Sequence, residues 1–298
     1  MSSRFKEYDS RKMVYTSKAM RVMVTVSRLY TEIFCDLYGT IFDIHTDENN
    51  PQVWDDMCEY MNKRGTHFSD GEELFNAYND AMTKALIIGR EERGQFVEID
   101  FVPVWHLLYE IGGAHVYEST AYDTATYFHR VSTDYLEPYP HAREFLAVCR
   151  RKGIRPILVS NAQESYTLYD LKAHHLTECF DKIFLSSTYG LKKPDKRFFN
   201  MALEECGTER SHVVYLGNEI GCDIRGARGA GIDAIYLHTP LSVPGDPATC
   251  PDAILNVEGP DYDAVLSWLC KDEVKIQGTG TDAKIVPAKS KKRTRQNS

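Results

Sequence analysis

Short apolar runs alternate with amphipathic helical patterns through the C-terminal half of the chain. From residue 142 the helical patterns alternate with apolar segments of strand length, and one further apolar strand is predicted at 32–35. Repeated helix–strand units with apolar strands are typical of a parallel sheet covered by helices on both faces. We therefore predict an α/β fold with a doubly wound parallel-sheet core. Its helices are predicted at 142–153, 164–176, 196–207 and 223–231, and its other strands at 154–160, 182–187, 212–217 and 233–237.

A different pattern fills the block between the first strand and the rest of the core. Apolar residues recur there at helical spacing, which predicts four helices and no strand. We predict that residues 47–135 form an all-helical cap inserted between two parts of the core, 29–46 and 136–270. Aromatic side chains on these helices are expected to pack the cap together, namely Trp54, Phe75, Tyr78 and Trp105. The four helices are predicted at 53–65, 71–87, 101–113 and 124–136.

The two ends of the chain read differently from the rest. Residues 1–28 form an N-terminal extension that the pattern does not assign. Residues 271–298 hold eight Lys or Arg against three Asp or Glu and have no helical or strand period. We interpret this basic tail as a disordered, solubilising end, and a nucleic-acid or localisation role for "KSKKRTR" is the alternative.

Composition narrows the function classes. The net charge of −8 implies no general attraction to nucleic acid, and no apolar run approaches the roughly 18 to 20 residues of a membrane span. The eight cysteines are scattered without zinc-site spacing, which indicates a reducing compartment. We therefore expect a cytoplasmic protein with a small-molecule substrate and no membrane partner, and the sequence leaves the oligomeric state open.

Polar residues stand where predicted strands end. Asp36 and Ser160 end two strands, the Gly217–Asn218 pair ends a third, and Lys193 lies in the loop after a fourth. In parallel sheets the carboxyl ends of the strands meet at one edge, where ligands bind. A carboxylate placed there can form a covalent intermediate that divides one displacement into two easier steps. The pattern therefore predicts that these four segments bring polar groups to one edge of the sheet, where a ligand would bind.

Four ordered motifs, "DLYGT", "LVSNA", "KKPDKRFF" and "YLGNEIGCDIRGARGAGI", resemble those of the haloacid dehalogenase superfamily. The resemblance covers residues 31–240, and the helical block lies where that superfamily inserts its cap. It implies a hydrolase in which Asp36 attacks and Ser160 hydrogen-bonds the transferred group. It further implies that Lys193 stabilises Asp36 and the developing charge, with the neighbouring Lys192 as the alternative.

The same resemblance suggests the other site residues. Tyr38, Thr40, Asn161 and Asn218 are predicted to bind substrate. Mg²⁺ is the predicted cofactor, because it prefers oxygen ligands and often uses only one or two carboxylates. Its predicted ligands are Asp36, the backbone carbonyl of Tyr38, the Asn218 side chain and Asp223, with Glu219 as a further nearby carboxylate.

Two departures leave the chemistry open. Phosphatases of this superfamily usually carry Asp where this chain has Tyr38, and a phenol with a pKa of about 10 is a poor base at neutral pH. L-2-haloacid dehalogenases carry "YGT" here. They also bind the substrate carboxylate and halide with an arginine of the cap, and Arg64, Arg90 and Arg93 do not match the position of that arginine. Phosphatases also usually have Asp at Asn218. We favour hydrolysis of a small phosphate ester, with a 2-haloacid dehalogenase and a non-catalytic binding protein of this fold as alternatives.

Overall fold

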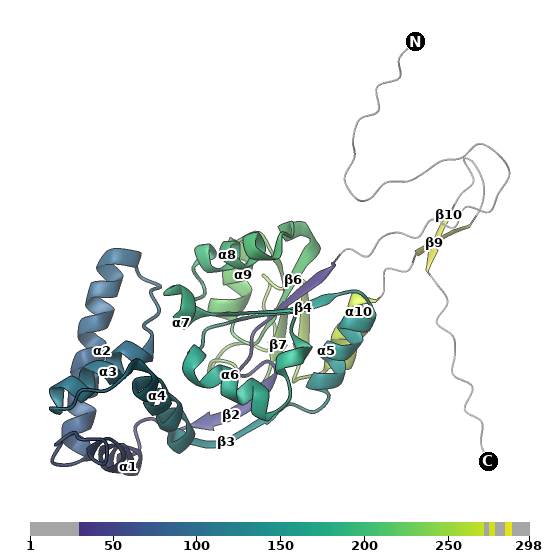
Figure 1. The fold of residues 1–298 in the computed structure, drawn as a ribbon. Coiled ribbons are helices and arrows are strands. Elements are labelled where there is room, and N and C mark those ends of the chain that lie inside the picture. The colour runs from purple at the N-terminus through teal and green to yellow at the C-terminus, as the bar shows by residue number, and fades with distance from the viewer. Residues whose placement is uncertain (1–29, 271–273, 278–283, 288–298) are drawn as a thin grey trace, which may run out of the picture.

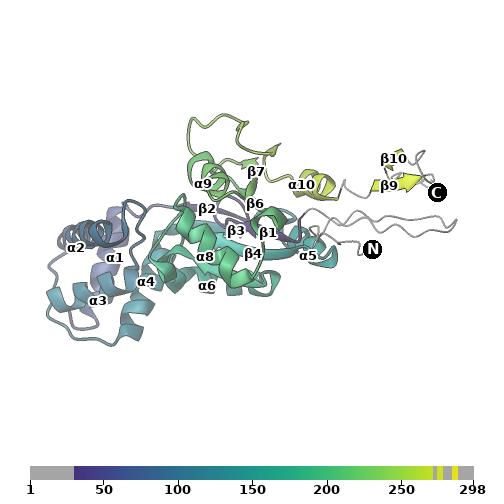
Figure 2. The same cartoon turned by 90° about the horizontal axis from the view of Figure 1, so that it is seen from above.

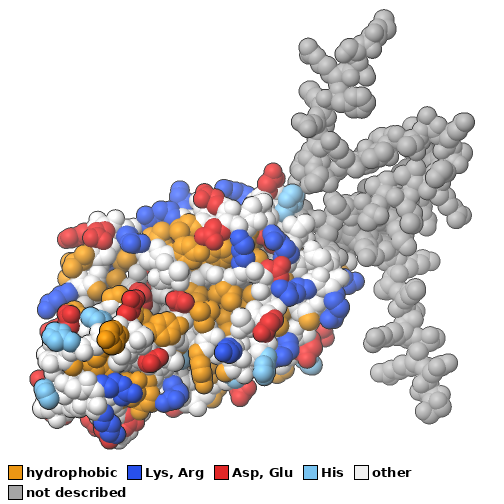
Figure 3. Space-filling model, viewed as in Figure 1, with side chains coloured by type: hydrophobic (Ala, Val, Ile, Leu, Met, Phe, Trp, Pro, Cys, Tyr) orange, Lys and Arg blue, Asp and Glu red, His pale blue; other side chains and the backbone are white. Residues whose placement is uncertain are grey.

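The computed structural model describes residues 30–270, 274–277 and 284–287. The prediction of an unassigned extension at 1–28 lies outside these residues. Figure 1 shows two parts: an α/β core and a group of helices, α1 to α4, at one end of it. On the face shown in Figure 3, side chains of Lys and Arg lie interspersed with those of Asp and Glu.

The core is built on one sheet, and the predicted parallel topology is confirmed. Within residues 30–270, six strands pair in the order β5-β4-β1-β6-β7-β8, every pair parallel. The first strand therefore lies near the middle of the sheet, between β4 and β6. The strands are β1 (Glu32–Cys35), β4 (Arg155–Ser160), β5 (Lys182–Leu185), β6 (Val213–Gly217), β7 (Asp233–His238) and β8 (Leu255–Glu258).

Alternate residues of each strand face opposite sides of the sheet, and both sides are covered. In β1, Ile33 and Cys35 join one buried cluster, whereas Phe34 joins the other. Because both faces are buried, the strands are continuous apolar runs. Helices α5 (Ala142–Arg151), α6 (Glu164–Ala173) and α10 (Tyr262–Leu269) contribute to the first cluster, and α8 (Lys196–Cys206) and α9 (Arg225–Gly229) to the second. Figure 2 again shows helices α1 to α4 at one end of the core.

The cap has a buried cluster of its own. Trp54, Trp105 and Phe128 meet at its centre, with ring centroids 5.2 Å apart for Phe128 and either tryptophan. The aromatic packing predicted for the cap is thus confirmed, with Phe75 and Tyr78 also against Trp54. Among the described helices none is both long and apolar enough to cross a bilayer. The cap helices are α1 (Pro51–Asn62), α2 (Gly71–Arg93), α3 (Phe101–Ile111) and α4 (Glu118–Ser132).

A two-stranded ribbon joins the cap to the core, and here the sequence prediction was wrong. The helix predicted at 124–136 ends at Ser132, and β3 (Thr133–Pro138) pairs antiparallel with β2 (Phe42–Thr46). Thr133 and Tyr135 favour strands, and Pro138 at the end cannot donate to a ladder. The ribbon brings both cap connections to the sheet edge that holds Asp36.

Other elements were missed or misplaced because they are short. The strand predicted at 182–187 ends at Leu185, followed by α7 (Ser186–Tyr189), and the helix predicted at 223–231 begins as a π-helical turn, η3 (Ile220–Ile224). The strand β8 and the helix α10 were not predicted. In the tail, where no strand was expected, β9 (Val274–Gln277) and β10 (Lys284–Pro287) pair antiparallel. Two 3₁₀ turns complete the list, η1 (Thr177–Cys179) and η2 (Arg210–His212).

Truncation of the cap centre should destabilise the protein. Phe128 is 1% exposed, and Phe128→Ala should lower the free energy of unfolding by about 3–5 kcal/mol, because a buried ring is lost and a cavity remains. Tyr117→Ala, at a ring that is 85% exposed, is the matched control and should change it by less than about 0.5 kcal/mol. Urea unfolding followed by fluorescence measures both, and equal effects would contradict the assignment of the cap core.

Candidate functional site

Three neighbouring strands bring the predicted residues together. Since β4, β1 and β6 run parallel and adjacent, the residues that follow or end them share one edge. Asp36 follows β1, Ser160 ends β4, and Asn218 follows β6. This edge faces the cap helices, and the loop with Lys193 returns to it between β5 and α8.

The Asp36 carboxylate is held by one oxygen. Its Oδ1 accepts hydrogen bonds from Ser160 Oγ at 2.8 Å and from Lys193 Nζ at 2.6 Å. Its Oδ2 has no hydrogen-bond partner among the described residues. Burial raises the pKa of Asp36 to about 6, although Lys193 acts in the opposite direction and Asp223 adds to the rise. The carboxylate is thus oriented, mostly ionised at neutral pH, and free at one oxygen.

Lys193 lies at the centre of the site. Its Nζ also donates to Asp223 Oδ1 at 2.7 Å and to the hydroxyl of Tyr215 at 2.7 Å. Burial lowers the pKa of Lys193, but Asp223 and Asp36 outweigh it and hold the pKa above its ordinary value. The side chain is therefore a buried cation. Lys192, the alternative, instead lies near the surface with its Nζ 3.9 Å from Glu98.

Asn161 positions the backbone of Lys193. The Lys193 amide donates to Asn161 Oδ1 at 2.8 Å, and Asn161 Nδ2 donates back to the Lys193 carbonyl at 3.1 Å. The Asn161 side chain was predicted to bind substrate, but its amide oxygen and nitrogen both bind the loop that carries Lys193. This reciprocal pair ties the end of β4 to the loop before α8.

Both oxygens of the Asp223 carboxylate accept hydrogen bonds from other groups of the protein. Its Oδ1 accepts from Lys193 and from the Tyr215 hydroxyl, and its Oδ2 accepts from the backbone amides of Asn218 at 3.0 Å and Glu219 at 2.9 Å. Any Cβ on Gly217 would lie 2.4 Å from Asp223 Oδ2, so only glycine fits there. The sequence analysis missed Tyr215, although a tyrosine inside a buried strand signals that its hydroxyl needs a partner.

Thr40 and Asn218 bind each other instead of facing the cavity. Thr40 Oγ1 donates to Asn218 Oδ1 at 3.0 Å, and Asn218 Nδ2 donates to the carbonyl of Leu241 at 3.1 Å. Both residues are buried. They fix the turn after β1 against the loop after β6. Their predicted contact with substrate is not supported by this arrangement.

Tyr38 points its hydroxyl toward α6. The phenol donates to Asp170 Oδ2 at 2.7 Å and lies 3.2 Å from Thr167 Oγ1. His129 Nε2 from the cap lies 3.0 Å from the same Asp170 oxygen. Burial, followed by the nearby Asp170, raises the pKa of Tyr38 well above its ordinary value. Neither Asp170 nor His129 was predicted, since no motif links them to the first strand.

A cavity of about 110 Å³ lies against these groups. It holds three carboxylates and one ammonium, so ionised side chains would leave it with a net negative charge. Burial and then Asp223 raise the pKa of Glu219, which lines this cavity. The three cap arginines do not line it. The lining residues are Asp36, Tyr38, Ser160, Asn161, Lys193, Glu219, Cys222 and Asp223.

The predicted magnesium ligands fit only in part. The side-chain oxygens of Asn218 and Asp223 already accept protein hydrogen bonds, and the described residues include no group of three or more His, Cys, Asp or Glu suited to a metal. What remains are Asp36 Oδ2, the predicted backbone carbonyl of Tyr38 and the Glu219 carboxylate, all three from residues that line the negative cavity. Mg²⁺ often binds through one or two carboxylates together with water and substrate oxygens. These three oxygens are the donors that fit.

Comparisons with known proteins point to one family of hydrolases. A family model described as haloacid dehalogenase-like hydrolase matches residues 32–231. A phosphoserine phosphatase of Thermus thermophilus is 35% identical over 38% of this chain and 45% of its own length. A glyceraldehyde 3-phosphate phosphatase of Methanothermobacter thermautotrophicus is 32% identical over 39% and 51%. The match thus spans about half the length of these curated relatives.

Solved structures of two chemistries share the fold. A 2-haloacid dehalogenase of Pseudomonas syringae has a TM-score of 0.55 at 20% identity, over 80% of this chain and 98% of its own. A phosphatase of Thermococcus onnurineus has a TM-score of 0.51 at 18% identity, over 80% and 97%. Because both chemistries occur on the fold, the fold by itself does not choose between them.

The Ser160 hydroxyl should lower the pKa of Asp36. Ser160→Ala removes a donor to the charged carboxylate, so the Asp36 titration midpoint should rise above about 6. Carbon-detected NMR of the Asp36 carboxyl measures this midpoint. Ser186→Ala is the matched control, because Ser186 follows the neighbouring β5 but donates to Glu98. A midpoint that falls in Ser160→Ala would contradict the geometry.

Proposed function

This chain belongs to the haloacid dehalogenase-like hydrolases, and we propose that it hydrolyses a small phosphate ester through a covalent intermediate on Asp36. The observation that carries the proposal is that the two oxygens of the Asp36 carboxylate differ in their contacts. Asp36 Oδ1 is fixed by Ser160 and Lys193, while Oδ2 is free beside the cavity. A nucleophile oriented through one oxygen can attack through the other.

The proposed reaction has two steps. In the first, a bond forms between Asp36 Oδ2 and phosphorus while the ester P–O bond breaks, and the leaving oxygen takes the electron pair. In the second, water attacks phosphorus and the bond to Oδ2 breaks, so that its electron pair returns to the Asp36 carboxylate. Phosphate leaves with one hydrogen of the water, and the other proton passes to solvent, from which the released oxygen takes up a proton. The Lys193 ammonium, fixed between Asp36 and Asp223, stabilises negative charge near the reacting group without having to reorganise.

Mg²⁺ remains a prediction for this reaction. If bound, it would be held by the Glu219 carboxylate and the backbone carbonyl of Tyr38 and would offset the negative charge of the cavity and of the phosphate, which leaves Asp36 Oδ2 to attack. Asn218 and Asp223, the other predicted side-chain ligands, serve here as the frame that holds Thr40 and Lys193. The cytoplasmic location likewise stays a prediction.

The two alternatives have weaker support. A dehalogenase needs a cation for the substrate carboxylate, yet Arg64, Arg90 and Arg93 do not line the cavity and Lys193 is already paired with two carboxylates. Tyr38 remains the feature that favours it, because a halide leaves without a proton. A non-catalytic binding protein would not need a nucleophile that is oriented by a buried cation.

Replacement of the nucleophile should abolish turnover. Asp36→Asn keeps the shape of the side chain but removes the attacking charge, so phosphate release should fall by at least about 10³-fold. The assay is a panel of phosphate esters and 2-haloacids, run with Mg²⁺ and with a chelator. Chelator-resistant halide release without phosphate release would instead support the dehalogenase, and turnover by Asp36→Asn would remove the central claim.

The two adjacent lysines provide a matched pair. Lys193→Met should lower kcat by about 10²–10³, because it removes the fixed charge beside Asp36. Lys192→Met should leave kcat within about twofold, since its ammonium lies near the surface and contacts only Glu98 at 3.9 Å. Steady-state kinetics on the best substrate of the panel, with circular dichroism to check folding, measures both. If Lys192→Met lowered kcat and Lys193→Met did not, the role assigned to Lys193 would belong to Lys192.

A further inference from the structure

The cavity beside Asp36 is small and holds one cation. Its volume of about 110 Å³ lies well below the roughly 300–1,000 Å³ of sites for drug-sized ligands, and a cavity of about 150 Å³ holds a single benzene ring. Among the residues that line it, Lys193 is the one cation, and its ammonium already binds Asp36 and Asp223. The group bonded to the phosphate must therefore be small, and a carboxylate on it would find no partner.

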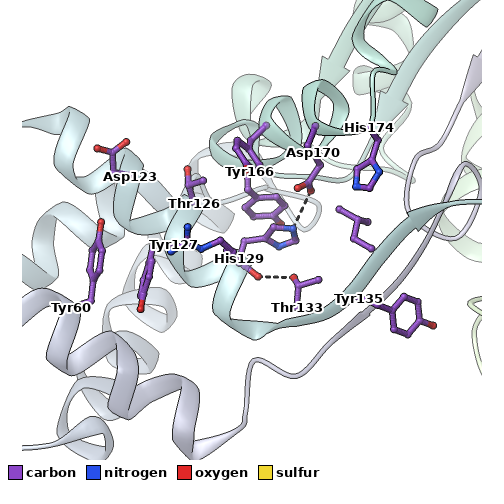
Figure 4. Close-up of a pocket in the computed structure, with 14 residues that line it drawn as sticks. Tyr60, Asp123, Thr126, Tyr127, His129, Thr133, Tyr135, Tyr166, Asp170 and His174 are labelled. Atoms are coloured by element: carbon purple, nitrogen blue, oxygen red, sulfur yellow. Dashed lines mark hydrogen bonds and ion pairs between the residues drawn. The ribbon is translucent and has the colours of Figure 1, made fainter.

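The room for this group does not continue into the larger cavity nearby. That cavity measures about 470 Å³, lies between α4 and α6, and is drawn in Figure 4. It is lined by His129 and Asp170, among others, and none of its lining residues lines the cavity at Asp36. Tyr38 lines the small cavity and donates to Asp170, so Tyr38 bounds the small cavity on this side.

Tyr38 also has no proton free for a leaving group. It stands where phosphatases of the superfamily usually carry the acid that protonates the leaving oxygen. Its hydroxyl donates at 2.7 Å to Asp170, on the side away from Asp36. The donor proton is therefore committed to a buried carboxylate, and an alkoxide leaving from phosphorus would receive none from this residue.

The other groups around the cavity are committed as well. The Ser160 hydroxyl donates to Asp36, and the Lys193 ammonium is bound by carboxylates on two sides. Glu219 accepts a hydrogen bond from the Cys222 thiol and is the side chain proposed to hold Mg²⁺. Both contacts of Glu219 use the ionised carboxylate, which has no proton to give. The leaving group must therefore depart from phosphorus without protonation.

A carboxylate is a leaving group that meets this condition. Carboxyl groups have pKa values of about 4, so they leave as anions at neutral pH, whereas alcohols do not. The phosphorylated Asp36 is itself a mixed anhydride of a carboxylic acid and phosphoric acid. Attack of Asp36 on an acyl phosphate thus exchanges one such anhydride for another. A phenol would also leave more readily than an alcohol, but an aromatic ring beside the phosphate exceeds the volume of the cavity.

We propose that this protein hydrolyses small acyl phosphates, such as acetyl phosphate, in preference to alkyl phosphate esters. The bond between Asp36 Oδ2 and phosphorus forms, the P–O bond to the acyl group breaks, and the carboxylate leaves with the electron pair and without a proton. Water then releases phosphate from Asp36. The inference rests on the proposed phosphatase function and changes only the group bonded to phosphorus. It assigns this selectivity to Tyr38, which bounds the cavity in place of an acid.

The first experiment compares acetyl phosphate with two others on the full-length protein, after subtraction of spontaneous hydrolysis. Ethyl phosphate matches it in size but must expel an alkoxide, and benzoyl phosphate also expels a carboxylate but carries a ring. A positioned acid contributes about 10²–10⁴-fold, so without one we expect kcat/KM for acetyl phosphate to exceed that for ethyl phosphate by at least about 10³-fold. It should exceed that for benzoyl phosphate by at least about tenfold, mainly through KM.

A pair of variants at Tyr38 separates the missing acid from the greater intrinsic reactivity of acyl phosphates. Tyr38→Asp supplies an acid, and Tyr38→Asn has nearly the same shape without one. We expect kcat/KM for ethyl phosphate to be at least about tenfold higher in Tyr38→Asp than in Tyr38→Asn, and kcat/KM for acetyl phosphate to differ by less than about threefold. Circular dichroism checks that both variants fold, and the comparison of substrates on the unaltered protein stands without them.

The outcomes distinguish this inference from the proposed function. Ethyl phosphate hydrolysed within about tenfold of acetyl phosphate would overturn the inference and leave the phosphatase standing. So would a Glu219→Gln variant that loses ethyl phosphate hydrolysis and keeps that of acetyl phosphate, because Glu219 would then be the acid. Equal rates for benzoyl and acetyl phosphate would overturn the limit on size, and equal Tyr38 variants the role of Tyr38. No phosphate release from any of the three would overturn the proposed function together with the inference.

Discussion

The ammonium of Lys193 lies between two carboxylates in the interior of the protein, and the site depends on that arrangement. A buried charge is costly unless opposite charge and hydrogen bonds surround it. Asp36, Asp223 and the Tyr215 hydroxyl supply these contacts at 2.6–2.7 Å. Without the lysine, Asp36 would keep Ser160, and Asp223 would keep Tyr215 and two backbone amides, but the two buried carboxylates would lose the cation between them.

That requirement explains why so much of the neighbouring polar structure does not touch the cavity. The Asn161 amide holds the backbone of Lys193, and the amides of Asn218 and Glu219 hold Asp223. Thr40 in turn fixes Asn218. These contacts leave Lys193 little freedom to move, and a fixed charge stabilises a developing charge better than a mobile one. The frame thus contributes to the proposed chemistry without meeting the substrate.

The sequence could predict what depends on order along the chain. Parallel strands place their ends at one edge, so Asp36, Ser160 and Lys193 could be assigned together before any contact was known. It could not predict contacts between side chains that are distant in sequence. Tyr215 reads as one more apolar strand residue, and Asp170 as a polar residue on a helix. The motifs also favoured Thr40 and Asn218 as substrate contacts, because spacing does not show which way a buried side chain points. The last cap helix ends at Ser132, earlier than predicted, because pairing of the following residues with β2 outweighed the local helical pattern.

The interaction of Tyr38 with Asp170 and His129 connects the frame to the cap. His129 comes from α4 and Asp170 from α6, so the hydrogen bonds that orient Tyr38 join the two parts of the molecule beside the nucleophile. Tyr38, which by motif alone only replaced an acid, thus also closes one side of the site. In the proposed function, the buried lysine and its carboxylates serve the reaction, and Tyr38 with its contacts to Asp170 and His129 bounds the site on the side of the cap. Because phosphatases and dehalogenases share this fold, the contacts around the nucleophile, and not the fold, must distinguish their chemistries.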